Sequence, residues 1–483
     1  MLLRQTILYL PAQIVGPLSQ MAAAFIWTFW LGPEALGVYA IIWAMQELAY
    51  RVILVWWSSY VKRYVTTHEG NGERIRLDRM ETAVQLWAAV VQTACAFPAL
   101  WIVLEHAPSV ELVAATLAFT LTRNLISHFS ERTRAQFETL AFTLLQVVGS
   151  ALGLVLGLFA VAFVAATAEA LLWSYAIAQF LGLVLAAPLI RFNVSRPQVD
   201  WLLLERSWIY GAPVLLSSVL AWVSNNGIRF IVEYDQGAAA VGLVTVGWWL
   251  GQRLTAFAAL LVTGASFNVA VERLRQMGRA AALPQLATNG AILLAILFPT
   301  VVGAFLLNKE MVDVLVAEPY RQTTVAILPL AIFAGALHAF RTHSIDQAFL
   351  LFARTKLTIL STGVEAVATA AFCWIGLEVG GAVGAAAGCM IASAVATAFG
   401  IALARVKFGF YLRIDDLLRI AAGAAVMALA LAAIPDASSF TRLAVEVAGG
   451  AVVYFAVMAM LYPAISRQLI DQSKARLVRL ITA

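Results

Sequence analysis

Residues 31–40, L-G-P-E-A-L-G-V-Y-A, form a short turn between two long apolar runs of the sequence. A weaker copy of this arrangement returns about two hundred residues later, because A-A-V-G-L-V around Gly242 aligns with E-A-L-G-V-Y around Gly37. In the same alignment Pro11 falls on Pro213 after a short insertion. Repetition on this scale is typical of a duplicated helical bundle, and it decides the predicted fold.

The composition of the chain is that of a membrane protein. The chain has 483 residues, of which 62% are hydrophobic and 12% are charged, and its mean hydropathy is +0.85. A soluble domain carries about 25% charged residues. We find about fourteen stretches near the ~20 residues that cross a bilayer. They begin near residues 6, 35, 81, 110, 137, 168, 206, 238, 284, 321, 356, 382, 418 and 444. The sequence therefore predicts an all-α polytopic membrane protein.

Basic residues give the predicted orientation, because Lys and Arg in short loops stay on the cytoplasmic side. They collect in alternate loops, and the opposite face keeps only Lys309, Arg321 and Arg442. We therefore expect both termini in the cytoplasm of a cell with a bacterial inner membrane. A cleaved signal peptide is the alternative for the N-terminus, but the apolar run passes Trp30 and exceeds a signal core of about 7–15 residues. The net charge of +5 suits loops beside anionic lipid and gives no argument for nucleic acid.

The repeat unit spans six predicted helices. The first span matches the seventh, and the fifth matches the eleventh, where R-A-Q-F from Arg134 aligns with R-T-K-L from Arg354. Because six is even, both copies enter the membrane from the same side as parallel lobes. The predicted domains are an N-terminal lobe at 1–195, a C-terminal lobe at 196–405, two extra helices at 406–463 and an amphipathic cytoplasmic tail at 464–483.

Several kinds of chemistry are missing from the sequence. It has no G-x-x-x-x-G-K-[ST] run for ATP hydrolysis and no H-E-x-x-H or Cys/His cluster for a metal, so we expect no cofactor. Membrane glycosyltransferases usually need a large acidic outer loop, whereas the longest predicted outer loop, at 308–320, is short. Glycines spaced four apart at 149–157 and 376–388 predict close helix packing. We therefore expect a transporter and no enzyme.

Three motifs in order resemble a known family: the turn at 31–40, the R-A-Q-F start of the fifth span, and V-G-G-A-V-G-A-A-A-G at 379–388. The chain is similar to polysaccharide flippases and exporters of the multidrug/oligosaccharidyl-lipid/polysaccharide superfamily. The resemblance implies two six-helix lobes around a central cavity that opens alternately to either side. It implies as cargo a polyprenyl-pyrophosphate-linked oligosaccharide for surface polysaccharides such as O-antigen or exopolysaccharide. Relatives with fourteen spans use the last two helices beside a lipid-tail groove, which would suit 418–463.

An anionic headgroup needs fixed cations at membrane depth, and arginine binds phosphate bidentately. Arg51 follows Gly37, and Arg253 follows Gly242, at distances that differ by nearly one helical turn. The two lobes would therefore place an arginine on similar faces, and together these would form a pyrophosphate clamp. The alternative for Arg51 is a packed ion pair with Glu47, one turn before it.

Other polar residues inside spans are secondary candidates. Arg229, with Asn225 and Asn226, would contact sugar hydroxyls, unless its side chain reaches out to water. Arg123, near the end of span four, has the same alternative.

Span ten carries two helical pairs, His338 with Arg341 and His343 with Asp346. They would form a protonatable gate, or else a polar helix end. Glu365 in span eleven would couple transport to protons or sodium, or else stabilise its lobe by hydrogen bonds.

Three further functions stay open at the level of sequence. A lipid II flippase would be expected to show more arginines in the first lobe than Arg51 and Arg123. A cation-coupled multidrug antiporter would need a buried acid in an apolar cavity, and span one offers only Gln13, Ser19 and Gln20. A scaffold that binds a polysaccharide polymerase without transporting would not depend on the cavity arginines. Membrane lipids are expected partners in every case.

Overall fold

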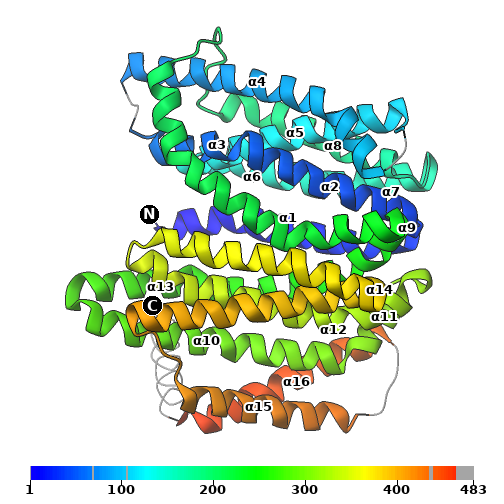
Figure 1. Ribbon diagram of the computed structural model, residues 1–483, viewed down its shortest axis with the longest axis vertical. Helices are drawn as coiled ribbons and strands as arrows, with labels where there is room; N and C mark the ends of the chain where they lie inside the picture. The colour runs from blue at the N-terminus through cyan, green and yellow to red at the C-terminus, as the bar shows by residue number, and fades with distance from the viewer. Residues whose placement is uncertain (1, 68–69, 105–106, 435–438, 464–483) are drawn as a thin grey trace, which may run out of the picture. The chain divides into compact units, whose positions relative to one another are not determined.

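A computed structural model describes residues 2–67, 70–104, 107–434 and 439–463. All regular elements within them are helices (Figure 1). The first ten are α1 (Leu2–Trp30), α2 (Pro33–Ile53), α3 (Val55–Tyr64), α4 (Asn71–Leu104), α5 (Val110–Ala135), α6 (Thr139–Val147), η1 (Val148–Leu152), α7 (Gly153–Phe163), α8 (Ala168–Ala186) and η2 (Ala187–Leu189). The others are α9 (Trp201–Met277), α10 (Arg279–Leu306), α11 (Asn308–Leu315), α12 (Glu318–Phe340), η3 (Arg341–Ile345), α13 (Asp346–Leu351), α14 (Thr355–Phe408), α15 (Ile414–Ala432) and α16 (Phe440–Leu461). The predicted tail at 464–483 lies outside the described residues.

The chain divides into two compact units. Unit 1 comprises Met1–Val246 and Thr362–Ala392, and unit 2 comprises Gly247–Ser361 and Ser393–Ala483. Helices α9 and α14 each contribute to both units. The lobes expected from the sequence repeat stay a prediction, and each unit is described by itself below.

The described helices confirm the predicted all-α multi-pass fold. Nine of them are long and apolar enough to cross a bilayer, and a tenth span results if α2 and α3, which meet at an angle of 59°, are counted together. Two of the nine, Trp201–Leu260 and Thr355–Phe408, are long enough for two crossings each. Each is broken at a glycine with positive φ, Gly237 in α9 and Gly381 in α14. Each double-length helix therefore accounts for two of the predicted spans.

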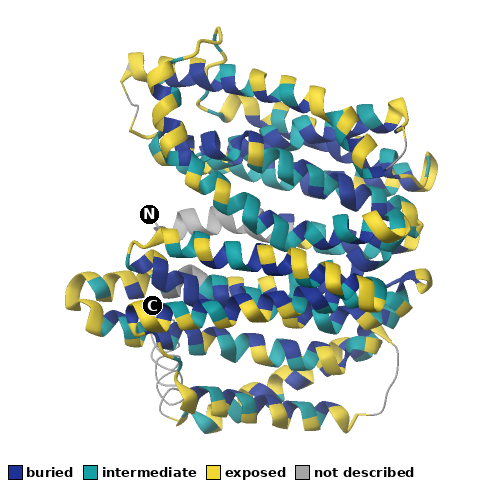
Figure 2. Cartoon of the chain, viewed as in Figure 1, coloured by how far each residue is buried: buried dark blue, intermediate teal, exposed yellow. Residues whose placement is uncertain are grey.

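The exposed side chains also fit a lipid environment. Figure 2 shows helices such as α4 and α15 with buried and exposed positions alternating along their length. Large apolar side chains occupy many of the exposed positions; Ile102 in α4 is 75% exposed and Leu429 in α15 is 73% exposed. Such side chains are unfavourable in water, whereas the hydrocarbon core of a bilayer solvates them.

The turn at residues 31–40 contacts its own repeat inside unit 1. Gly37 in α2 and Gly242 in α9 pack so closely that a Cβ on Gly37 would overlap the carbonyl of Ala238. A Cβ on Gly242 would likewise overlap the carbonyl of Pro33. The two copies of the motif therefore face each other, and only glycine lets the two backbones approach so closely.

A turn that contains a residue with positive φ is also repeated, before α6 and before α14. Phe137 has φ 59° and Ala353 has φ 54°, the two positive values that the described residues show outside glycine. In both turns the next residue donates a backbone hydrogen bond five residues back, Glu138 to Thr133 and Arg354 to Phe349. The structure thus pairs the two spans as expected but corrects the alignment, because the counterpart of Arg354 is Glu138 and not Arg134.

The two series of glycines spaced four apart, at 149–157 and 376–388, lie where helices pack closely, as predicted. The first, in η1 and α7, lies against α8 and α1, where Gly153 contacts Tyr175 and Gly157 contacts Trp27. The second joins the two arms of α14 across their bend, with Gly376 against the backbone of Gly384.

Candidate functional site

The candidate site is a polar cavity inside unit 1, between α2, α3 and α5. Its volume is about 170 Å³. It is lined by Trp43, Gln46, Glu47, Tyr50, Arg51, Val55, Arg123 and Ser127. Three of the charged residues selected from the sequence, Glu47, Arg51 and Arg123, therefore lie around one cavity.

Helical spacing explains why these residues share the cavity. Trp43, Glu47 and Arg51 are each four residues apart in α2 and so lie on one face of the helix. Arg123 and Ser127 have the same spacing in α5. Arg51 occupies the last turn of α2, where a cation interacts favourably with the helix dipole.

The two cavity arginines have different surroundings. The guanidinium of Arg123 lies over the indole ring of Trp43, 5.4 Å from its centroid, so it is held inside the unit by a cation–π contact. Arg51 donates from Nη1 to the carbonyl of Ser218 in α9, a long bond of 3.4 Å. The Nε of Arg51 is buried and has no hydrogen-bond partner among the described residues. Buried donors are normally satisfied, so this arginine is poised to bind an acceptor.

Glu47 does not form the predicted ion pair with Arg51 in the described part of the chain. One carboxylate oxygen of Glu47 instead accepts a hydrogen bond of 3.1 Å from the side-chain amide of Asn226. The side-chain oxygen of Asn226 in turn accepts a hydrogen bond from buried Arg229. Asn226 and Arg229 are thereby joined to the cavity, whereas Asn225 turns back to the carbonyl of Ala221 in its own helix.

The remaining candidates lie elsewhere. Arg253 is half-buried and belongs to unit 2, so the clamp predicted for Arg51 and Arg253 stays a prediction. Glu365 is 1% exposed and belongs to the part of α14 in unit 1. His338 is half-buried in the last turn of α12 in unit 2.

The structure changes the pairing expected in span ten. Arg341 is buried and forms an ion pair of 2.9 Å with Asp346, and it also donates to the hydroxyl of Ser361. The sequence spacing had paired Asp346 with His343. The difference arises because residues 341–345 form a π-helical turn, in which residues five apart lie on one face. The arrangement fits the structural alternative for these two charges.

Sequence reasoning missed a second polar cluster in unit 1. Arg132 is fully buried and forms ion pairs with both Asp78 and Glu81. Glu81 also contacts Nε2 of His128 at 2.8 Å, and Nδ1 of this histidine contacts the hydroxyl of Ser58 at 2.8 Å. The available signal was the spacing of Asp78 and Glu81 three apart in one helix, and of His128 and Arg132 four apart in the next.

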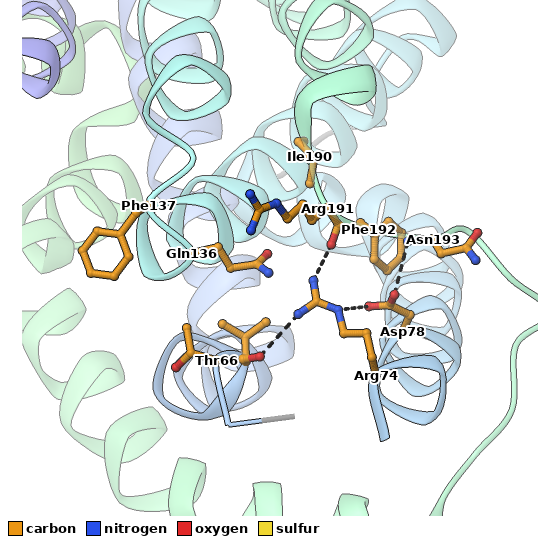
Figure 3. Close-up of a pocket in the computed structure, with 10 residues that line it drawn as sticks. Thr66, Arg74, Asp78, Gln136, Phe137, Ile190, Arg191, Phe192 and Asn193 are labelled. Carbon is orange, nitrogen blue, oxygen red and sulfur yellow. Dashed lines mark hydrogen bonds and ion pairs between the residues drawn. The ribbon is translucent and has the colours of Figure 1, made fainter. Parts of the chain in front are cut away.

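This cluster borders a surface pocket, shown in Figure 3. The pocket has a volume of about 860 Å³ and is lined by Val65, Thr66, Arg74, Asp78, Gln136, Phe137, Ile190, Arg191, Phe192 and Asn193. The side chains of Arg74 and Asp78 point toward each other and toward the backbone of the segment after η2. The arrangement neutralises the charges internally.

Unit 2 has a groove between α10, α15 and α16. The groove has a volume of about 480 Å³, and Ile292, Phe455 and Met458 are among the apolar residues that line it. Arg413 and Arg419 also line it, together with Asp416, which forms an ion pair of 3.0 Å with Arg413. An apolar groove with cations in its lining fits an amphiphile with an anionic headgroup.

Known proteins share the sequence and the fold. A family model described as polysaccharide biosynthesis protein matches residues 82–325. No curated protein matches the chain. A solved lipid II flippase, MurJ, in an inward closed conformation matches with a TM-score of 0.73 and 13% identity, over 96% of this chain and 99% of the flippase.

Two transporters of the MOP superfamily are also similar. An inward-facing MATE multidrug resistance transporter has a TM-score of 0.62 and 18% identity, over 83% of this chain and 98% of that one. A transporter from Pyrococcus furiosus has a TM-score of 0.57 and 16% identity, over 84% of this chain and 95% of that one. At these identities the likeness establishes the fold.

Proposed function

The chain belongs to the polysaccharide biosynthesis protein family and has the fold of MOP transporters, and from this premise we propose that it flips a lipid-linked oligosaccharide. The proposed cargo is a polyprenyl-pyrophosphate-linked precursor of a surface polysaccharide. The observation that supports this cargo is the cavity of unit 1, where two arginines line a small polar space. The proposed membrane is the bacterial inner membrane, with both termini in the cytoplasm.

The general class of activity rests on the family and the fold. The family and the similar structures are transporters and flippases, so the expectation of a transporter and not an enzyme is confirmed. The apolar helices and these relatives likewise make the chain a multi-pass membrane protein. The identity of the cargo goes beyond these findings and is part of the proposal.

The chemistry of the cavity supports an anionic headgroup. A guanidinium presents several donors in one plane and matches a phosphate bidentately. Arg51 has a buried Nε without a partner among the described residues, so a phosphate oxygen would satisfy a donor that the protein leaves open. Arg123 is fixed over Trp43 and would contribute a second positive charge. Glu47 lines the same cavity and supplies a compensating negative charge.

The other selected residues have supporting roles in the proposal. Arg253 would complete the clamp from the second repeat, and Arg229, Asn225 and Asn226 would bind sugar hydroxyls. Glu365 is the proposed site for coupling to an ion, because it is a buried acid within a membrane-spanning helix.

The groove of unit 2 supports the lipid part of the cargo. The resemblance implies that the last two helices lie beside the lipid tail, and α15 and α16 form this groove together with α10. Its apolar wall would hold an isoprenoid chain by burial of hydrocarbon surface. A polysaccharide polymerase is a further proposed partner, since the released precursor must be polymerised.

A lipid II flippase is the second candidate function. The observation that favours it is the likeness to MurJ along nearly the whole of both chains. Lipid II presents the same polyprenyl pyrophosphate, so the cavity chemistry fits both cargoes. The two functions differ only in the sugar.

Leaflet translocation in proteoliposomes tests the proposal. The assay compares labelled polyprenyl-pyrophosphate oligosaccharide, lipid II and a cationic drug, each with the intact chain and with an Arg51→Ala, Arg253→Ala double variant. We expect the oligosaccharide lipid to be translocated by the intact chain and not by the variant. Transport of lipid II alone would establish the second candidate. Transport of the drug alone would overturn the proposal in favour of an antiporter, and equal transport by the variant would remove the clamp.

A further inference from the structure

The segment between α8 and α9 is bound at several positions by side chains of neighbouring elements. After η2, residues 190–200 form no helix, yet charged side chains of neighbouring helices bind their backbone. The carbonyl of Arg191 accepts hydrogen bonds from both Arg74 and Arg132. The backbone N–H of Asn193 donates to Asp78 at 3.2 Å (Figure 3). We call residues 190–200 the strap.

Both ends of the strap have further contacts. Near its start, the N–H of Arg191 donates to the carboxylate of Glu138 at 3.1 Å. Near its end, Arg79 donates to the side chain of Gln198 at 3.0 Å, and Arg76 forms an ion pair of 3.1 Å with Asp200. Hydrogen bonds to charged groups are about twice as strong as neutral ones, so the strap is bound more firmly than an ordinary loop.

The buried cluster behind the strap is built to bind it. Arg74 and Arg132 balance Asp78 and Glu81, so the four charges compensate one another. Buried ion pairs contribute little net stability compared with apolar packing, and their best-attested role is to fix one arrangement. Here each of three members also holds a backbone group of the strap. Positioning the strap accounts for their presence.

The strap leads directly into α9, which contacts two residues that line the cavity, Arg51 and Glu47. Within unit 1 the first half of α9 runs antiparallel to α2 and α3, and Gly211 packs on the backbone of Trp56. Further along, Trp222 donates to the carbonyl of Ala44 at 2.9 Å, and Asn226 binds Glu47. A displacement of the start of α9 from α3 would therefore expose Trp56, the neighbour of the lining residue Val55, at that end of the cavity.

We propose that the strap is a latch that holds the start of α9 against α3 and so closes the cavity of unit 1 at that end. In the proposed topology this end faces the cytoplasm, where the cargo enters. Loading then requires release of the strap from Arg74, Asp78 and Arg132. The role assigned to the cavity rests on the proposed function, whereas the latch itself is a property of unit 1.

Cysteine labelling tests the latch without any cargo. The three native cysteines, Cys95, Cys373 and Cys389, are replaced by alanine, and Ser127 in the cavity lining is replaced by cysteine. A membrane-impermeant maleimide is then applied to each face of proteoliposomes. Arg74→Gln removes donors to the strap and is the test variant. The matched control is Arg63→Gln, which changes an exposed arginine that has no strap contact.

A second variant closes the latch instead of opening it. Arg79→Cys with Gln198→Cys allows a bifunctional maleimide to join the strap to α4, where these two side chains meet. Labelling of Ser127→Cys then needs a second reagent, applied after the first has been removed. Trypsin cleavage after Arg191 reports independently whether the strap is released.

The expected result is a labelling rate at least tenfold higher in Arg74→Gln, from the face that trypsin also cleaves. Arg63→Gln should match the parent, and the cross-linked protein should label more slowly than the parent. Faster cleavage in Arg74→Gln with unchanged labelling would overturn the latch, because the strap would then not control access. If Arg74→Gln does not accumulate, the cross-linked protein provides the test. An equal labelling rate of Ser127→Cys with and without the cross-link would then overturn the proposal. Neither outcome depends on whether the cargo assignment is right.

Discussion

Replacing Gly37 by alanine should separate the two copies of the repeated turn. The added Cβ would overlap the carbonyl of Ala238, which is backbone and does not rotate away. Overpacking of a well-packed core costs about 1–3 kcal/mol, and rigid backbone places this site near the upper end. Alanine in place of a helical glycine returns about 1 kcal/mol through backbone entropy. We therefore expect Gly37→Ala to lower the free energy of unfolding by about 2 kcal/mol.

A matched control separates the effect of the lost helix contact from the effect of the higher helix propensity of alanine. Gly449 lies within α16, and a Cβ there would meet nothing within 4 Å. Gly449→Ala should leave the stability unchanged or raise it. Gly37→Ala combined with Gly242→Ala should cost less than the sum of the single variants, since one separation of the helices relieves both overlaps.

Unfolding in mixed micelles with a rising fraction of sodium dodecyl sulfate, followed by circular dichroism, measures these differences. If Gly37→Ala proves as stable as Gly449→Ala, the two glycines do not meet as described. A double variant that costs the full sum would show that the two overlaps are separate, and the facing arrangement of the two motifs would be wrong.

Three further predictions concern charged groups. Arg51→Lys keeps the charge but loses the Nε donor, so translocation in proteoliposomes should fall about tenfold, as the loss of one charged hydrogen bond implies; an equal rate would contradict phosphate binding by this group. Arg132→Met removes the arginine partner of buried Glu81 and leaves Asp78 with Arg74 only, so it should cost about 3–5 kcal/mol of unfolding free energy, part of which an added Glu81→Gln should recover. Burial raises the pKa of Glu138 above its ordinary 4.5, so its protonated form favours the folded state, and this contribution is lost as the pH rises through the raised value. Unfolding measured between about pH 4 and pH 7 should therefore show a decline that is absent from Glu138→Gln.

Hydropathy and repetition were sufficient to predict the fold. The thickness of the bilayer fixes the length of each span, and its hydrocarbon core requires an apolar composition, so both can be read from the sequence. The turn at residues 31–40 and its copy around Gly242 were visible because glycine marks both the turn and the close approach of the helices. The double-length helices were predicted as separate spans for the same reason, since each bend lies at glycine.

The polar contacts could be predicted only in part. Trp43, Glu47 and Arg51 share one face because α2 is a regular helix there, and the spacing predicted this correctly. The partner of Glu47 is Asn226, far away in sequence, and spacing carries no information about such a contact. The pairing of His343 with Asp346 was wrong for another reason: a π-helical turn shifts the helical face by one residue and brings Arg341 to Asp346.

The two halves of the repeat preserve backbone geometry and differ in charge. Phe137 and Ala353 share the same left-handed conformation before the same kind of helix, although one is aromatic and the other small. In that alignment Arg132, the centre of the buried cluster, corresponds to Ala348, and Glu138 corresponds to Arg354. These two charges therefore differ between the copies, although Arg279 donates to the carbonyl of Lys407, which is the counterpart of Arg191 in this alignment. A duplication that keeps helix packing while the charges around the strap differ between the copies yields a repeated fold with an asymmetric arrangement of charge, and the proposed entry of cargo from one side needs such an asymmetry.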